Sequence, residues 1–272
     1  MTEERTSTTR VALIPAQRHA MILQWLQTDG AVSVQQLADA IGASVSTLRR
    51  DLETLEAAGF VDRSFGGASL RAHALTTLEP GHAVATHIRH DEKAAIGMLA
   101  ARAIEPHQAV IFDSSSTVRE AARAIMARNI PLTAMTNDLA VAQMLAGAPQ
   151  IKVIVVGGVV RSGSMTLFGA PGEEFLLGVK ADVALMGAHA VTPDGVSEAT
   201  IEITRVKQLI LRATRTTRVL VDHTKLKEPA LFRICGLESI DEIITDAGAD
   251  TGICTSLRER GPRVSISSPP GA

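Results

Sequence analysis

Six short apolar runs recur through the second two-thirds of the chain, and they constrain its fold more than any other feature. They are AVIFD (109–113), IPLTAMT (130–136), IKVIVVG (151–157), ADVALMG (181–187), TRVLVD (217–222) and EIITD (242–246). Runs that are apolar throughout are typical of strands in a parallel sheet that is covered on both faces, and helical stretches separate them here. The pattern predicts an open, Rossmann-like α/β domain over residues 91–255.

Residues 14–70 have a different pattern, with short amphipathic helices and tight turns. Ser33 and Gln36 form a capping box at the start of one helix, and Gly42 is a helix stop. Ser44 can cap a second helix, which carries an apolar stripe of leucines. A preceding helix, about 17–28, is expected to bury Ile22, Trp25 and Leu26. Together these elements predict a helix-turn-helix.

The second of these helices carries the candidate DNA contacts. At 100° per residue, Ser46 and Arg50 lie opposite the leucine stripe, with Thr47 and Arg49 on its flanks. Hydroxyl and guanidinium groups in the first two turns are what a recognition helix presents to bases and phosphates. The following segment, 60–68, alternates and runs into Gly66-Gly67, which indicates a β-wing whose Arg63 can reach a phosphate. By spacing alone, a small helical domain with solvated arginines remains an alternative.

The segment LADAIGASVSTLRRDLETLEAAGFVDRSFGGA (37–68) closely resembles the DNA-binding domain of the DeoR family of bacterial transcription regulators. The matching features are L-A-x-x-x-G before the turn, the T-L-R-R-D-L core from Thr47 to Leu52, and Gly66-Gly67-Ala68. The resemblance implies that segment 42–51 reads the DNA groove. It adds one residue to the candidate DNA contacts, which become Ser44, Ser46, Thr47, Arg49, Arg50 and Arg63.

Small polar residues and glycines follow the apolar runs, where an open α/β sheet binds its ligands. Ser114–Thr117 follow the first run, Thr136-Asn137 the second and Gly157-Gly158 the third, and Lys225 comes shortly after the fifth. Free amides at helix starts, with a nearby lysine, favour an anion such as a phosphorylated small molecule. Ordinary helix caps and turns contain the same residue types at the same positions, so a purely structural role for these residues stays an alternative. The P-loop and G-x-G-x-x-G fingerprints of nucleotide sites are absent from the sequence.

Residues 91–246 also resemble the DeoR-type effector domain, which is related in fold to ribose-5-phosphate isomerase and the CoA-transferases. The shared landmarks include Lys93, Asp113–Thr117, Lys207 and Asp222–Lys225. The resemblance implies a sensor of phosphorylated sugars or related metabolites. The candidate effector-binding residues are Asp113, Ser114, Ser115, Ser116, Thr117, Thr136, Asn137, Gly157, Gly158 and Lys225.

Two positions depart from the family pattern. Ser115 stands where the D-x-G-[ST]-T loop of the family has glycine, and a serine there is expected to narrow the pocket or change the ligand. His189 stands where the family's G-x-D-G motif has aspartate. The isomerase relatives use acids in this loop for proton transfer, so His189 argues against isomerase chemistry.

Bulk charge gives no sign of a nucleic-acid partner, because 27 Lys+Arg face 29 Asp+Glu, for a formal net charge of −2. No apolar run approaches the roughly 18 to 20 residues of a membrane span, and the two cysteines form no C-x-x-C pair. We therefore expect a cytoplasmic protein without cofactor or metal. The four histidines of segment 71–90 have no metal-ligand spacing and indicate a solvated linker (His73, His82, His87 and His90).

The predicted organisation is a disordered tail (1–13), a winged helix-turn-helix (14–70), a linker (71–90), an effector domain (91–255) and a second disordered tail (256–272). The predicted function is a DNA-binding regulator, a repressor of sugar-metabolism genes, which a phosphorylated sugar releases from double-stranded operator DNA. We expect a homo-oligomer, a dimer or tetramer, because two recognition helices would then enter successive major grooves. Two alternatives stay open: a sugar-phosphate isomerase fused to a helix-turn-helix, and a ligand-independent DNA-binding protein whose second domain only oligomerises.

Overall fold

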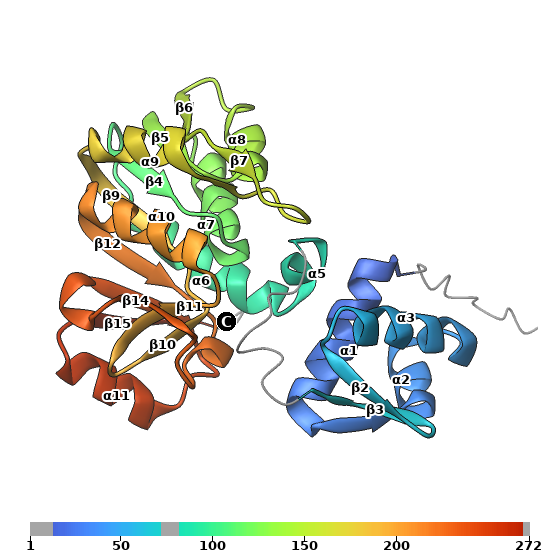
Figure 1. Ribbon diagram of the computed structural model, residues 1–272. Coiled ribbons are helices and arrows are strands. Elements are labelled where there is room, and N and C mark those ends of the chain that lie inside the picture. Colours follow the sequence, from blue (N-terminus) through green and yellow to red (C-terminus); the bar gives the residue numbers. More distant parts are fainter. Residues whose placement is uncertain (1–12, 72–81, 269–272) are drawn as a thin grey trace, which may run out of the picture. The chain divides into compact units, whose positions relative to one another are not determined.

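The computed structural model describes residues 13–71 and 82–268. The chain divides into two compact units, residues 1–74 and 75–272, which we describe separately (Figure 1). No helix in the described part of either unit has both the length and the apolar character needed to cross a bilayer.

The first unit is a winged helix. Its elements are α1 (Pro15–Asp29), β1 (Ala31–Ser33), α2 (Val34–Ile41), α3 (Val45–Ala57), β2 (Val61–Ser64) and β3 (Gly67–Leu70). Strand β3 pairs antiparallel with both β1 and β2, and α2 and α3 form the helix-turn-helix. The winged helix-turn-helix predicted from the sequence is confirmed.

Local signals in the sequence set the boundaries of α2. Ser33 Oγ accepts a hydrogen bond from the Gln36 amide (3.1 Å), while Gln36 Oε1 accepts one from the Ser33 amide (2.9 Å). Gly42 has a φ of 74°, a left-handed conformation that glycine adopts at little cost, and it ends the helix. The predicted burial of Trp25 is wrong, because this side chain is 39% exposed. Leu23 takes its place in the core beside Ile22 and Leu26.

The second unit is built on a seven-stranded parallel sheet in the order β15-β14-β12-β9-β4-β5-β6. The six predicted runs supply β4 (Ala109–Phe112), β5 (Leu132–Thr136), β6 (Ile151–Val155), β9 (Ala181–Met186), β12 (Thr214–Leu220) and β14 (Glu242–Asp246). The α/β fold class is therefore confirmed.

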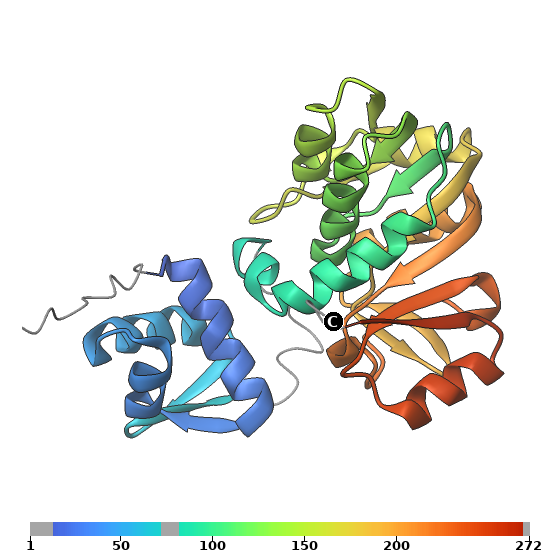
Figure 2. The same cartoon turned by 180° about the vertical axis from the view of Figure 1, so that it is seen from behind.

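Helices cover both faces of this sheet, which explains why its strands are apolar throughout. Val110 and Phe112 of β4 pack in the same core as α6 (His90–Arg102), α7 (Ser116–Ala127) and α8 (Leu139–Leu145). Ile111, between them, packs with α9 (Ala170–Leu177) and α10 (Ile201–Arg212) on the opposite face. Figure 2 shows the face covered by α6, α7 and α8.

Smaller strands that the apolar runs did not predict complete the unit. Strands β10 (Ala190–Thr192), β11 (Gly195–Glu198) and β13 (Phe232–Cys235) form a three-stranded sheet. Strands β7 (Val159–Val160) and β8 (Leu167–Phe168) form a hairpin. These segments are only two to four residues long, so their periodicity is too short to distinguish them from loops.

The sheet has a topological switch point between β4 and β9. From β4 the chain adds β5 and β6 on one side, and later adds β9, β12, β14 and β15 on the other. The loops after β4 and β9 therefore leave the sheet in different directions, which opens a crevice at the carboxyl ends of these strands.

Two of the predicted boundaries are wrong where the structure describes them. The predicted tail 256–272 contains the end of α11 (Thr251–Glu259) and the edge strand β15 (Arg263–Ser267), which pairs with β14. Val264 of β15 is buried against the core, but an edge strand with polar neighbours resembles a polar tail in sequence. Residues 269–272 lie outside the described residues.

The predicted linker 71–90 contains the short helix α5 (His82–His87) and the first residue of α6. Hydrogen bonds from side chains elsewhere in the unit hold α5, and this tertiary contribution has no local sequence signal. Residues 1–12 and 72–81, including His73, lie outside the described residues.

Candidate functional site

The first turns of α3 present the predicted DNA-contacting side chains to solvent. Ser46, Arg49 and Arg50 are exposed, and Thr47 is half-buried. Ser44 Oγ accepts a hydrogen bond from the Thr47 amide (3.1 Å) and caps the helix. It also lies within hydrogen-bond distance of the Ser46 and Thr47 hydroxyls (2.9 and 2.8 Å). The hydroxyls therefore form one cluster at the helix N-terminus, next to the two arginines.

A buried ion pair, which the sequence analysis missed, fixes α3 against α1. Asp51 is 5% exposed, and both of its carboxylate oxygens accept hydrogen bonds from Arg18 of α1 (2.7 and 3.0 Å). His19 Nε2 lies 3.0 Å from Asp51 Oδ1. The hydrogen bond to Asp51 raises the pKa of the Arg18 guanidinium, so this group stays charged. Asp51 is buried against α1, whereas Arg49 and Arg50 are exposed, so Asp51 positions the helix that carries the two arginines.

The wing differs in one respect from the sequence expectation. Arg63 Nη1 lies 3.2 Å from Glu53 and 3.6 Å from Glu56, both on α3. A phosphate would have to compete with these carboxylates, although an exposed pair of this kind contributes little free energy. At the wing tip Phe65 is fully exposed (110%), beside Gly66 in its left-handed conformation. The exposure of Phe65 could not be read from the alternation of the strand.

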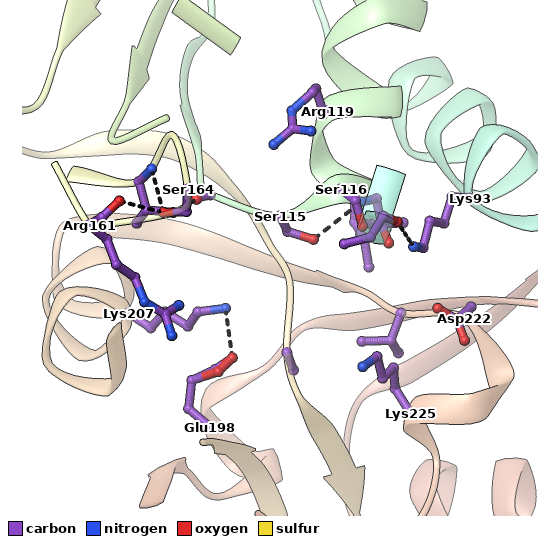
Figure 3. Close-up of a pocket in the computed structure, with 17 residues that line it drawn as sticks. Lys93, Ser115, Ser116, Arg119, Arg161, Ser164, Glu198, Lys207, Asp222 and Lys225 are labelled. Carbon is purple, nitrogen blue, oxygen red and sulfur yellow. Dashed lines mark hydrogen bonds and ion pairs between the residues drawn. The ribbon is translucent and has the colours of Figure 1, made fainter. Parts of the chain in front are cut away.

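A cavity of about 120 Å³ lies at the carboxyl ends of β4 and β12, at the switch point. Five of the ten predicted effector residues line it, namely Ser114, Ser115, Ser116, Thr117 and Lys225 (Figure 3). The structure adds side chains that the sequence analysis did not include among the binding residues: Lys93, Arg119, Arg161, Ser164, Thr166, Glu198, Lys207 and Asp222.

The other five predicted effector residues lie outside this lining. Asp113 is buried beneath it, and Thr136 accepts a hydrogen bond from the Asp138 amide (3.0 Å) at the end of β5. Asn137 donates to the Leu167 carbonyl (3.2 Å). Gly157 and Gly158 lie against Pro171 and Phe168 respectively, so that they shape the β7–β8 region.

A buried charge network supports the floor of the cavity. Lys207 Nζ lies 2.9 Å from Asp113 Oδ2 and 3.5 Å from Glu198 Oε1, and it donates to the Gly187 carbonyl (2.7 Å). Asp113 Oδ2 also accepts a hydrogen bond from the Gly187 amide (3.0 Å). The network ties the ends of β4 and β9 to α10 and β11.

Ser115, the first departure from the family pattern, packs directly on this loop. A Cβ at Gly187 would overlap the Ser115 side chain. Ser115 Oγ accepts from the Thr117 amide (3.3 Å) and caps α7, and Ser114 is hydrogen-bonded to Thr166 of the β7–β8 region. The absence of a side chain at Gly187 thus makes room for Ser115. His189, the second departure, is 2% exposed and is absent from the cavity lining.

The cavity end near the α7 N-terminus is cationic (Figure 3). Lys93 is 6% exposed, and burial lowers its pKa to about 8, with Asp222 acting against this effect and Lys225 and Arg119 reinforcing it. The pKa of Asp222 is lowered: burial alone would raise it, but Lys93 and Lys225 together with Thr224 outweigh that effect. This carboxylate stays ionised and is a weak proton acceptor, which does not suit a general base.

A histidine–carboxylate pair lies beyond the cavity at the ends of β12 and β14. Asp246 accepts hydrogen bonds from the His223 ring (2.7 Å) and amide (2.7 Å). The ring hydrogen bond is the main cause of the raised pKa of His223, while the pKa of Asp246 is lowered by its bonds to His223 against the effect of burial. No group of three or more potential ligands among the described residues has the arrangement of a metal site.

Family models match both units. The DeoR-like helix-turn-helix domain matches residues 18–73, and the DeoR C-terminal sensor domain matches residues 88–247. Among curated proteins, the chain is 30% identical to the HTH-type transcriptional regulator GolR of Listeria innocua, over 93% of this chain and 99% of that protein. It is 29% identical to the HTH-type transcriptional repressor GlcR of Bacillus subtilis (90% and 93%). It is also 29% identical to the glycerol-3-phosphate regulon repressor of Escherichia coli K12 (89% and 95%).

Two solved structures match the chain distantly. Ribose 5-phosphate isomerase A of Methanocaldococcus jannaschii aligns with a TM-score of 0.39 at 14% identity, over 51% of this chain and 55% of that one. The eIF-2B protein of Pyrococcus horikoshii aligns with a TM-score of 0.45 at 16% identity, over 84% and 87%. Likeness at this level supports no functional inference.

Proposed function

Since this chain belongs to the DeoR family of transcriptional regulators, we propose that its second unit binds a phosphorylated sugar or a related metabolite and that this binding releases operator DNA from the first unit. The relatives are named as regulators and repressors, one of them of a glycerol-3-phosphate regulon, and not as enzymes. The chain is accordingly a DNA-binding regulator of sugar metabolism and not an isomerase. We place it in the cytoplasm as a homo-oligomer, at least a dimer.

The observation that carries the effector proposal is the cationic cavity at the switch point. It combines a helix N-terminus, the hydroxyls of Ser115–Thr117 and the cations Lys93 and Lys225 at one end. An anionic phosphate suits that end, because helix dipole and ammonium groups both favour negative charge. At the other end, the carboxylate of Glu198 lines the cavity and offers acceptor oxygens, which suit the hydroxyl groups of a sugar.

DNA recognition is assigned to Ser44, Ser46, Thr47, Arg49 and Arg50 of the α3 region, with Arg63 and Phe65 on the wing. The exposed arginines are proposed to reach base edges or phosphates, and Ser44 holds the helix start. Phe65 offers an apolar group that can lie against the sugars of the minor groove.

The effector proposal is tested with the full chain and with DNA fragments that it selects from a random pool. Phosphorylated sugars are titrated into the complex and fluorescence anisotropy follows DNA release, with the unphosphorylated sugars as controls. Lys225→Met should abolish release while leaving DNA affinity unchanged, and Lys152→Met, at an exposed site in β6, should behave as wild type.

If no phosphorylated sugar in a broad panel releases DNA or raises the melting temperature, the proposal fails. The second unit would then serve assembly alone. Turnover of a sugar phosphate by the pure protein would instead revive the isomerase alternative.

A further inference from the structure

Helix α5 is the first described element after the segment that follows the winged-helix unit in the chain, and two cavity side chains hold it. Lys93 Nζ donates a hydrogen bond to the Ala85 carbonyl (2.8 Å), and Arg119 Nη1 donates one to Thr86 Oγ1 (3.0 Å). Both cations line the cavity (Figure 3). The lining also includes Ala85. The groups that hold α5 are therefore among those that a ligand would meet.

In both hydrogen bonds a positively charged side chain donates to an uncharged acceptor. Lys93 is buried and donates to a neutral carbonyl, and Arg119 gives one of its hydrogen bonds to a hydroxyl while another goes to Asp138 (3.0 Å). A phosphate oxygen adds the Coulomb attraction between opposite charges to the hydrogen bond, so it is a stronger acceptor for these two cations than a carbonyl or a hydroxyl. Burial is the main cause of the lowered pKa of Lys93, about 8, and the ionised Asp222 acts against it.

Resting on the function proposed above, we propose that Lys93 and Arg119 form the subsite for the phosphate of the effector, and that phosphate and α5 compete for these two side chains. When phosphate oxygens accept the hydrogen bonds of Lys93 and Arg119, the bonds to Ala85 and Thr86 are lost. Helix α5 then loses these two hydrogen bonds. Because α5 directly follows the segment that leads from the DNA-binding unit, its release changes how the chain enters the effector unit.

Hydrogen–deuterium exchange of the full chain tests this competition, with inorganic phosphate as the probe and chloride at equal ionic strength as the control. Phosphate should slow exchange at Ser115–Thr117 and accelerate it in α5 by about tenfold or more, because α5 opens more often. Lys93→Met should accelerate exchange in α5 without phosphate and remove the response to it. Protection at Ser115–Thr117 with unchanged exchange in α5 would overturn the inference, and so would a lack of any protection by phosphate.

Thr86→Val gives a sharper test, because Thr86 is absent from the cavity lining. Removing the hydroxyl frees Arg119 from one of its bonds to α5, so the affinity for inorganic phosphate should rise about threefold or more. Thr255→Val, at an exposed position in α11, is the matched control and should leave the affinity unchanged. Weaker or equal phosphate binding by Thr86→Val would overturn the competition.

These outcomes separate the inference from the proposed function. If phosphorylated sugars release DNA while α5 is unaffected, only the competition fails. If neither phosphate nor any phosphorylated sugar binds, both fail.

Discussion

At the scale of single residues, Arg50 is the side chain on which DNA recognition depends most directly. It is exposed on the face of α3 opposite the buried leucines. Arg50→Ala should weaken operator binding by about 1–3 kcal/mol if the guanidinium binds a base edge in bidentate fashion. Fluorescence anisotropy at fixed salt measures the change, with Arg260→Ala in the second unit as the control. Unchanged affinity would remove Arg50 from the recognition surface.

Asp51 has a structural role that can be separated from DNA binding. Asp51→Ala leaves Arg18 without its carboxylate partner, and the loss of this partly buried, charge-assisted pair should cost about 1–3 kcal/mol. The chain contains one tryptophan, Trp25, which lies in α1, so its fluorescence reports the unfolding of the first unit. The denaturant midpoint of that transition should fall, whereas Asp39→Ala at an exposed site should leave it in place. An unaltered midpoint in Asp51→Ala would show that the pair adds no stability.

Ser115 and Gly187 form a second testable pair. Gly187→Ala should destabilise the second unit by about 1–3 kcal/mol, because the new Cβ overlaps the Ser115 side chain. When Ser115→Gly removes that side chain, there is room for the alanine at position 187. The double variant should therefore regain most of the melting temperature that Gly187→Ala alone loses in thermal unfolding. Independent, additive effects would contradict the contact.

At the scale of elements, the His223–Asp246 pair joins the segment after β12 to the end of β14 and predicts a pH dependence. The raised pKa of His223 gives stability that is fully present below its unfolded value of 6.5 and is lost as the pH rises through the folded value. The lowered pKa of Asp246 gives stability that is present above 3.8 and is lost as the pH falls. The pair should therefore stabilise the second unit most between about pH 4 and 6.5.

The comparison of wild type with His223→Gln isolates this contribution. The difference in unfolding free energy should be larger at about pH 5.5 than at about pH 8.5. A difference that stays constant across this range would show that the pair does not titrate as inferred.

The elements also show where sequence reasoning succeeds and where it stops. Both the α2–α3 pair and the central strands carry local signals, such as the Ser33 capping box and uninterrupted apolar runs, and both were predicted. Helix α5 and strand β15 depend on partners far along the chain, such as Arg119 and β14, so their segments look like linker and tail. At the cavity, Ser114–Thr117 could be predicted because they directly follow a strand. Arg161 lies in the β7–β8 hairpin and Glu198 in the small three-stranded sheet, and the sequence periodicity predicted neither of these elements.

At the scale of the whole molecule, the charge balance constrains how the regulator binds DNA. The formal net charge is −2, so affinity cannot come from a general basic surface. The first unit of one chain offers three arginines to DNA, namely Arg49, Arg50 and Arg63. Of these, Arg63 already has carboxylate partners. The logarithm of the binding constant of a dimer should fall with the logarithm of salt concentration with a slope of about −5 or shallower. A slope steeper than about −8 would indicate phosphate contacts that these residues do not supply.

Lys93 donates its hydrogen bond to a main-chain carbonyl, and this predicts where mutations that alter the response to inducer should lie. The bond ends on the carbonyl of Ala85 and so does not depend on which side chain stands there. In a screen for alleles that no longer respond to inducer, or that are derepressed without it, hits should gather at Lys93, Arg119 and Thr86. A change of side chain at position 85 therefore keeps the hydrogen bond from Lys93, whereas loss of the hydroxyl at position 86 removes the one from Arg119.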